Sequence, residues 1–148
     1  MIAPVGPLGI AALLGLAALG LVLDEPALAA DPANGELLAG LAGCGACHTA
    51  DGGAPYAGGG PIETRFGTFR ATNLTPDPEH GLGGWTERDF ARAMRDGRAP
   101  DGHAYWPVFP YPAFSGLTDA DLADLWAYLR TIPPSATPNV ASEPDAGR

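Results

Sequence analysis

One short segment of the sequence places two thiols and an imidazole at fixed spacing, Cys44-Gly45-Ala46-Cys47-His48. This is the pattern of covalent c-type haem attachment. Each thiol can add across one vinyl group of a porphyrin, and the two-residue spacer lets one helical turn present both sulfurs to the ring edge. His48 then lies beneath the ring and can offer a neutral imidazole nitrogen to iron. Because the chain has only two cysteines, the pattern predicts one covalently attached haem c.

Three other uses of paired cysteines compete with haem attachment. A dithiol redox motif expects a βαβ setting, and the sequence does not alternate strands with helices. A structural zinc site needs two further ligands, and His80 and His103 lie at irregular distances from the cysteines. A disulfide across two residues would close too small a loop to stabilise the chain much. We therefore interpret the segment as a haem attachment site, with zinc and dithiol chemistry as the alternatives.

The length and charge of the chain limit its class and its partners. Its 148 residues suffice for one domain with a modest core, and 21 glycines and 16 prolines require many loops. The net charge of −9 argues against nucleic acid or an anionic membrane surface as a partner. It suits an encounter with a basic patch on another protein, although a solvated acidic surface is the commoner explanation of such a charge balance.

The N-terminal region has the composition of an export signal. Residues 8–23 are almost purely apolar, and Ala27-Leu28-Ala29 resembles a small-residue cleavage site. No Lys or Arg precedes the apolar run, so residues 1–30 are either an atypical signal peptide or a membrane anchor. Bacteria attach haem covalently outside the cytoplasm, so we expect an exported, periplasmic protein that could associate with a membrane through this segment.

The segment that leads into the cysteines, residues 34–43, has leucines at helical spacing and predicts a short helix with one apolar face. Gly40 lies in the middle of this helix, where glycine costs about 1 kcal/mol relative to alanine. It is either a tolerated weak position or the point where a second helix approaches closely.

Two further helices are predicted over 86–97 and 118–132. Thr86 and Thr118 have the sequence features of N-caps, each with an aspartate three residues later. Gly97 provides a stop signal for the first of these helices.

The rest of the mature chain reads as loop. Residues 49–84 contain no convincing element apart from a brief strand at 66–69, and so long an irregular stretch suits a domain whose loops pack on a cofactor. Residues 135–148 are polar and contain proline, which predicts a flexible tail. The predicted organisation is therefore a leader over 1–30, one haem domain over 31–134 and the tail.

The loop between the last two predicted helices, residues 97–116, is too aromatic to be a linker. Its side chains need an apolar surface, and the haem face opposite His48 is the obvious one. The aromatic and imidazole residues in this loop are His103, Tyr105, Trp106, Phe109, Tyr111 and Phe114.

The chain resembles class I c-type cytochrome domains, in particular the cytochrome c subunits of membrane-associated alcohol and aldehyde dehydrogenases and the modules that accompany molybdenum hydroxylases. The resemblance runs from about Gly35 to Pro134, and its most specific segments are Phe66-Gly67-Thr68, Thr72-Asn73-Leu74-Thr75-Pro76-Asp77, Gly83-Gly84-Trp85-Thr86 and Phe109-Pro110-Tyr111-Pro112.

The resemblance implies an all-α cytochrome c fold, with three to four short helices and long loops around one haem. It implies that Cys44 and Cys47 form the thioether bonds and that His48 is the proximal iron ligand. It further implies an electron carrier, not an enzyme, which passes electrons from a dehydrogenase to a respiratory acceptor.

Two departures from this family affect the expected function. The sequence has a single haem motif, whereas many relatives carry three haem domains. Phe109 stands where the family commonly has the distal methionine in a Pro-Ala-Met-Pro-Tyr-like motif. His103 is the best protein candidate for the distal ligand, and an open or water-bound iron is the alternative; we interpret Met94 as a core residue. An open distal side would suit a second function, the binding or reduction of a small ligand.

Several further residues are candidates for contact with the haem. Arg65 or Arg70, together with Asn73 and Trp85, could hold the propionates, because a guanidinium can pair with a carboxylate and an indole N–H can donate to one. Trp106, Phe109 and Tyr111 are expected to pack against the porphyrin.

Overall fold

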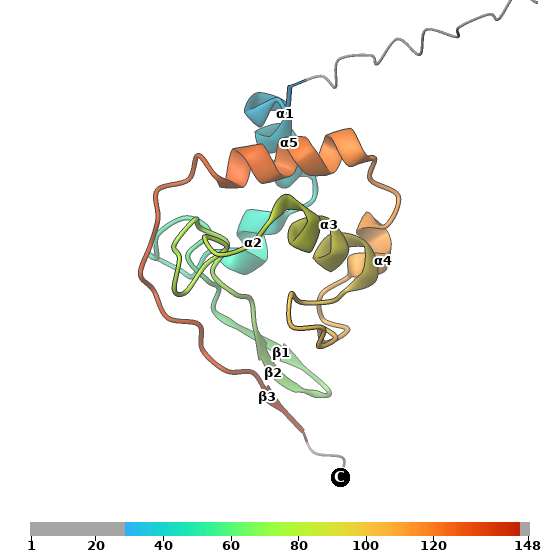
Figure 1. The fold of residues 1–148 in the computed structure, drawn as a ribbon. Coiled ribbons are helices and arrows are strands. Elements are labelled where there is room, and N and C mark those ends of the chain that lie inside the picture. The colour runs from blue at the N-terminus through green and yellow to red at the C-terminus, as the bar shows by residue number, and fades with distance from the viewer. Residues whose placement is uncertain (1–28, 146–148) are drawn as a thin grey trace, which may run out of the picture.

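The computed structural model describes residues 29–145, so all but the last two residues of the predicted leader lie outside the described part. Its helices are α1 (Pro32–Leu41), α2 (Cys44–His48), α3 (Glu87–Asp96), α4 (Tyr111–Phe114) and α5 (Asp119–Leu129) (Figure 1). Its strands are β1 (Pro61–Thr64), β2 (Gly67–Arg70) and β3 (Glu143–Pro144). Within residues 29–145, no helix has the length and hydropathy needed to cross a membrane.

The first and last helices, α1 and α5, cross (Figure 1), and Gly35 lies at the point of contact. A Cβ at Gly35 would overlap the backbone carbonyl of Asp124 and would lie 2.8 Å from Cβ of Tyr128. Asp124 also accepts hydrogen bonds from the Asp31 backbone N–H at 2.6 Å and from the Asn34 amide at 2.7 Å. The start of α1 is therefore fastened to α5 by polar contacts and by a close backbone approach.

Gly40 plays no part in this crossing. No atom lies within 4 Å of a Cβ built at Gly40, so of the two interpretations of this residue the structure favours the tolerated weak position.

Capping residues determine where α3 and α5 begin. In both helices a threonine accepts a hydrogen bond from the backbone N–H three residues later, and the aspartate there bonds back to the threonine. These capping boxes are the ones predicted at Thr86 and Thr118. Gly97, with φ of 62°, ends α3 in the left-handed conformation that glycine adopts without strain.

The three helices α1, α3 and α5 enclose the hydrophobic core. Met94 is part of this core, as the sequence predicts, and is 7% exposed. The buried residues of the cluster are Ala39, Leu82, Phe90, Met94, Leu122, Leu125, Leu129 and Ile132.

A small antiparallel sheet of order β1-β2-β3 departs from the predicted all-α fold. The chain is mostly helical, with short strands in the stretch predicted to be loop. Strands β1 and β2 form a hairpin in which Pro61 faces Arg70 and Thr64 faces Gly67. Gly67, with φ of 116°, permits the tight turn. The predicted brief strand at 66–69 corresponds to β2.

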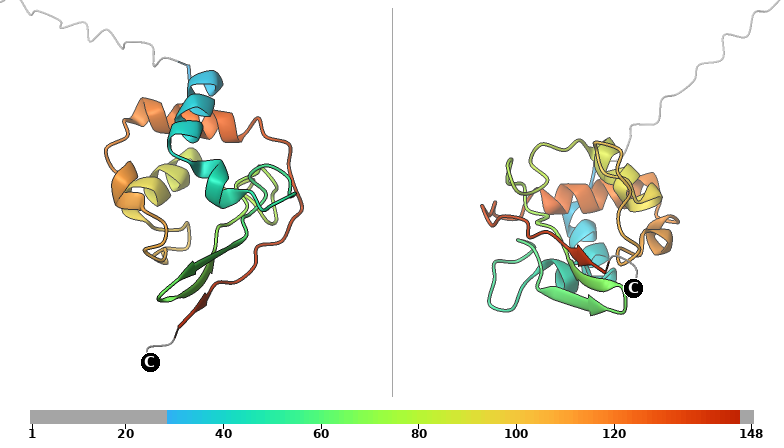
Figure 2. Two further views of the ribbon diagram at one scale, coloured as in Figure 1. Left: turned by 180° about the vertical axis from the view of Figure 1, so that it is seen from behind. Right: turned by 90° about the horizontal axis from the view of Figure 1, so that it is seen from below.

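Residues 135–145, which we call the C-terminal strap, run from the end of α5 back along the molecule to the hairpin, where β3 pairs with β2 (Figures 1 and 2). The buried side-chain amide of Asn73 donates hydrogen bonds to the carbonyl oxygens of Ser135 at 2.8 Å and Thr137 at 3.1 Å. The prediction of a flexible tail over 135–148 therefore fails for the strap. Its polar composition gave no sign that its backbone would be fastened by a buried amide.

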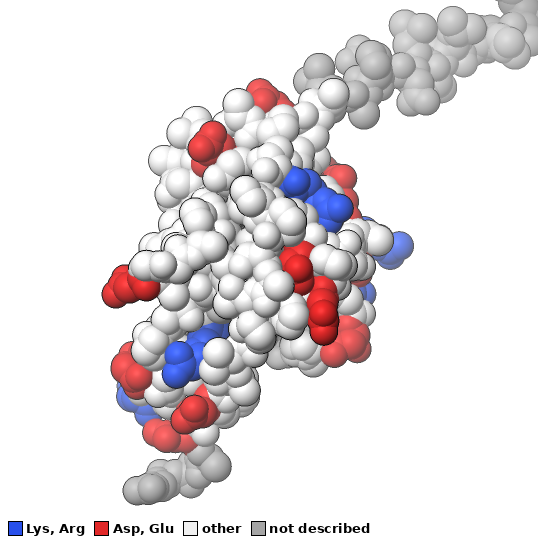
Figure 3. Space-filling model, turned by 90° about the vertical axis from the view of Figure 1, so that its left-hand side faces the viewer, with Lys and Arg blue, Asp and Glu red and all other residues white. Residues whose placement is uncertain are grey.

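Charged side chains are scattered over the surface. On the face shown in Figure 3, acidic and arginine side chains surround a broad uncharged area, and neither sign forms a continuous patch. The negative charge is therefore spread over that face.

Candidate functional site

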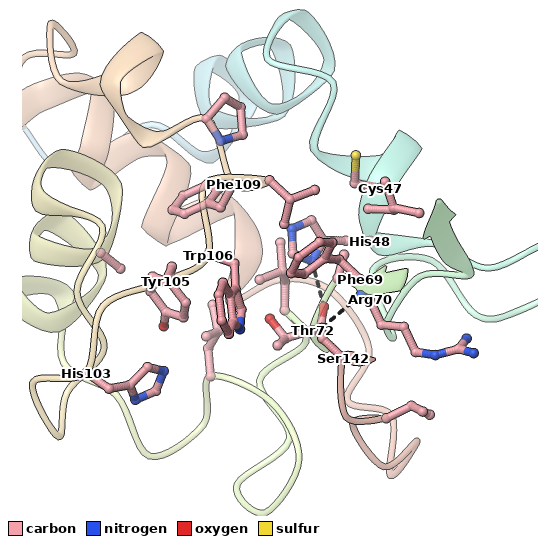
Figure 4. A pocket seen from close by; sticks show the side chains of 18 of the residues that line it. Cys47, His48, Phe69, Arg70, Thr72, His103, Tyr105, Trp106, Phe109 and Ser142 are labelled. Carbon is pink, nitrogen blue, oxygen red and sulfur yellow. Dashed lines mark hydrogen bonds between the residues drawn. The ribbon is translucent and has the colours of Figure 1, made fainter. Parts of the chain in front are cut away.

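A cavity of about 320 Å³ lies between α2, the β1–β2 hairpin, the loop after α3 and the C-terminal strap (Figure 4). Most of its wall is apolar. It brings together eight of the residues singled out from the sequence, which are Cys47, His48, Arg70, Trp85, His103, Tyr105, Trp106 and Phe109.

The two cysteines lie three residues apart on the single-turn helix α2, and both thiols are free. Gly43, with φ of 70°, separates this turn from α1 and allows the chain to change direction. Cys47 is exposed and lines the cavity, whereas Cys44 is half-buried and packs against the core. Burial raises the pKa of the Cys44 thiol. Residues at this spacing share one face of a helix, so both sulfurs can meet one edge of a planar ligand.

His48 is held in a defined orientation. Its Nδ1 lies 2.6 Å from the carbonyl oxygen of Thr72, and because a carbonyl can only accept, Nδ1 carries the proton. The other ring nitrogen, Nε2, therefore keeps its lone pair for a metal ion. Burial lowers the pKa of His48, with the hydrogen bond to Thr72 opposing the effect, so the neutral ligand form is favoured. An imidazole with its second nitrogen bonded to a carbonyl is the usual arrangement of a metal-binding histidine.

Aromatic side chains from the loop after α3 form the wall opposite His48 (Figure 4). Phe109 packs edge-to-face against Tyr105 at 5.7 Å and also contacts Phe114 at 5.9 Å. Trp106 contacts Phe69 on β2 at 5.7 Å and remains 52% exposed. Burial is the main cause that raises the pKa of Tyr105 to about 12, so this wall is uncharged at neutral pH.

The side chains that could bind iron from this wall differ in position. His103 lies at the rim, 59% exposed, with its Nδ1 hydrogen-bonded to Asp101 at 2.6 Å. Met94 lies in the core and is not among the residues that line the cavity. The aromatic wall itself presents Phe109, which has no ligating atom, at the place of the family's methionine.

Besides Cys44, three residues predicted to contact the porphyrin do not line the cavity. Arg65 stacks over the ring of Phe66 at 4.5 Å on the exposed hairpin. Asn73 is 2% exposed and uses its amide to hold the C-terminal strap. Tyr111 packs against Gly97, where any Cβ would overlap its ring.

Arg70, which the sequence offered as the alternative to Arg65, lines the cavity from β2. The structure adds two residues that the sequence did not indicate, Val140 and Ser142, which line the cavity from the C-terminal strap. The polar pattern of the strap gives no signal for this role. One pattern in the sequence could have indicated the hairpin. Along β2 an apolar residue, the buried Phe69, is followed by a charged one, the half-buried Arg70.

The two alternative uses of the cysteines find little support. Among residues 29–145, no three His, Cys, Asp or Glu side chains gather closely enough to hold a metal ion. The sheet in this part of the chain is antiparallel and lacks a βαβ unit. The free thiols, the oriented imidazole and the apolar walls fit a covalently attached haem instead.

Comparison with known proteins also supports a haem-binding domain. The family model described as "Cytochrome c" matches residues 32–133. The chain is 45% identical over 111 residues to the cytochrome c subunit of the quinone alcohol dehydrogenase of Gluconobacter oxydans, which covers 74% of the chain and 23% of that protein. It is 46% identical over 101 residues to one of the subunits of the nicotinate dehydrogenase of Pseudomonas putida, covering 68% of the chain and 8% of that protein. A dihaem c-type cytochrome of Cereibacter sphaeroides is 38% identical over 141 residues, covering 86% of the chain and 48% of that protein. The chain therefore spans less than half the length of each of these relatives.

Proposed function

The chain belongs to the cytochrome c family, and from that premise we propose that it is a single-haem electron carrier. It takes electrons one at a time from a periplasmic or membrane-associated dehydrogenase and passes them to a respiratory acceptor. A cytochrome c domain implies covalently bound haem c. The cytochrome c subunits among its relatives are electron-transfer components of dehydrogenases, not the catalytic subunits.

The orientation of His48 is the observation that carries this proposal. The Thr72 carbonyl fixes the imidazole with Nε2 available, and α2 places Cys47 beside the same cavity. When bound, the haem supplies a one-electron iron couple. The chain's own part is to bind it through Cys44, Cys47 and His48, to surround it with apolar side chains and to leave one side accessible. Trp106 and Val108, which are 52% and 36% exposed, lie on that accessible side.

Three details of the proposal, namely the single haem, the dehydrogenase as electron donor and the export of the protein, rest on separate observations. The sequence holds just two cysteines, which suffice for one haem. Its relatives include components of a quinone alcohol dehydrogenase and of a nicotinate dehydrogenase, which makes a dehydrogenase the candidate electron donor. The apolar run at residues 8–23 and the attachment of haem c outside the cytoplasm favour an exported protein that associates with a membrane through that run.

The proposal is tested on the full chain produced in a bacterium competent to attach haem c. Pyridine haemochrome absorbance and intact mass should give one covalent haem per polypeptide, and a quinone alcohol dehydrogenase with its substrate should reduce it in a stopped-flow experiment. Cys47→Ser is the matched variant, because it removes one thioether and keeps the volume of the side chain. A colourless wild-type protein, or a haem protein that no dehydrogenase reduces, would contradict the proposal.

A second function is favoured by the aromatic wall. Phe109 offers no ligating atom to the cavity, and Met94 is buried in the core. An iron held by His48 alone would leave a position for a small molecule, so the alternative is a haem protein that binds or reduces such a ligand. Carbon monoxide added to the reduced protein separates the two: a rapid spectral change supports the alternative, and an unchanged spectrum supports the carrier.

A further inference from the structure

Helix α1 presents an apolar face to solvent on the side turned away from α5. Leu37 and Leu41 are 59% and 78% exposed, and residues four apart lie on one side of a helix. Glu36 is the one charged side chain in the whole helix. We call this side the outer face of α1; its exposed residues are Ala33, Leu37, Gly40 and Leu41.

The two leucines differ from the other large apolar side chains that the described residues expose. Trp106, Val108 and Val140 line the cavity, and the guanidinium of Arg65 lies over the ring of Phe66 at 4.5 Å. The leucines of the outer face belong to neither place. A contiguous exposed apolar surface of this kind marks a contact with another apolar body.

The sequence before α1 indicates what that body is. Residues 1–23 contain no charged side chain, and a run of about 20 such residues is long enough to cross a bilayer. Residues 24–31 join this run to α1, and even a fully extended chain of that length reaches at most about 28 Å. A membrane that holds the apolar run therefore keeps the start of α1 close to its surface.

Lipid fits the outer face better than the apolar run itself does. The run at residues 8–23 is apolar throughout, and a helix of such composition needs an apolar environment on every side. The outer face of α1 could cover only one side of it. Leu37 and Leu41 can instead enter the boundary between lipid headgroups and acyl chains, as the apolar face of an interfacial helix does.

We infer that the outer face of α1 rests on the lipid surface that holds residues 8–23, with Leu37 and Leu41 in contact with lipid. The inference rests on the proposed function, which includes membrane association through that run. Helix α1 lies at one end of the molecule and the β1–β2 hairpin at the other (Figures 1 and 2). No residue of α1 lines the cavity, so this contact leaves Trp106 and Val108 free for a redox partner.

The test uses the full chain with its haem attached, reconstituted into phosphatidylcholine vesicles. Both native thiols are then thioethers, so a nitroxide reagent labels a single cysteine added by substitution. Leu41→Cys places the label on the outer face, and Phe66→Cys is the matched control, because it places the label at an apolar residue of the hairpin that is 60% exposed. Electron paramagnetic resonance measures how often each label collides with oxygen, which concentrates in lipid, and with a water-soluble nickel chelate. The ratio of oxygen to nickel collisions should be severalfold higher at residue 41 than at residue 66.

A second substitution in the protein labelled at residue 41 tests the remaining leucine. Leu37→Ser should shift the equilibrium between the lipid-bound and free positions of the domain roughly tenfold toward the free position, which lowers the collision ratio. Leu37→Met keeps an apolar side chain with similar helix propensity and should retain the ratio. If both variants lower it equally while circular dichroism shows both to be folded, the apolar contact is refuted.

The remaining outcomes separate this inference from the haem proposal. Equal ratios at residues 41 and 66 refute the lipid contact and leave the haem carrier standing. A label at residue 41 that meets neither oxygen nor nickel is covered by protein, either a second copy or residues 8–23, and this also contradicts the inference. A full chain that does not stay with the vesicles refutes the membrane contact alone, whereas a colourless wild type contradicts the proposed function and this inference together.

Discussion

The substitution of Gly35 by alanine tests the helix crossing that supports the site. A Cβ at this position overlaps the Asp124 carbonyl, which is backbone and cannot rotate away. Helices α1 and α5 must therefore separate, at a typical overpacking cost of about 1–3 kcal/mol. Separation also weakens the hydrogen bonds from Asp31 and Asn34 to the Asp124 carboxylate, and bonds to a charged acceptor contribute about 1.5–3 kcal/mol each. If one of these bonds is lost and helix propensity returns about 1 kcal/mol, the net loss should be about 1.5–5 kcal/mol.

Gly40→Ala is the matched control on the same helix. A Cβ there meets no atom within 4 Å, so this variant should gain about 0.5–1 kcal/mol from helix propensity alone. Guanidinium denaturation of the haem-loaded proteins, followed by far-ultraviolet circular dichroism, measures both free energies of unfolding. If Gly35→Ala proves as stable as Gly40→Ala, the close approach of α1 and α5 is not what holds them together.

Three further predictions concern the strap, a helix cap and the aromatic wall. Asn73→Ala leaves the buried Thr75 N–H and hydroxyl without the acceptor that they now share. The free energy of unfolding should fall by about 2–5 kcal/mol, and the C-terminal strap should be cleaved faster by proteases. An unchanged unfolding midpoint would show that the Asn73 amide does not fasten the strap. The Thr118 hydroxyl, and to a smaller extent its backbone N–H, donate hydrogen bonds to Asp121 and lower the pKa of its carboxyl group. The stability that the ionised Asp121 contributes is therefore complete above the unfolded carboxyl pKa of about 4. It is lost as the pH falls through the lower pKa of the folded state. Thr118→Ala should therefore make the free energy of unfolding depend less steeply on pH below about 4, and an identical slope would count against the cap. Phe109→Met should raise the midpoint potential, because a thioether ligand raises haem potentials; an unaltered potential and visible spectrum would mean that residue 109 does not reach the iron.

The parts of the fold that local chemistry determines were predictable from the sequence. Thr86 and Thr118 form the predicted caps because a threonine followed by an aspartate three residues later satisfies the free N–H groups of a helix start whatever surrounds it. Met94 lies in the core because its helical spacing places it on the apolar face of α3. The attachment segment forms one helical turn beside the cavity, as its spacing requires.

The parts that depend on contacts distant in sequence were not predictable. Nothing in the local sequence distinguishes Gly35 from Gly40, since the partner that selects Gly35 is about 90 residues away. Asn73 has the polarity of a propionate ligand, but its amide is used by strap carbonyls more than 60 residues later. Tyr111 was expected on the porphyrin and instead packs against Gly97, because α4 turns its ring toward the end of α3.

The half-buried position of Cys44 links the attachment segment to the interior of the protein. Cys47 faces the cavity, whereas Cys44 packs against the cluster of apolar side chains that α1, α3 and α5 enclose. A ligand joined to both thiols would therefore be anchored at once to the surface of the cavity and to the hydrophobic core.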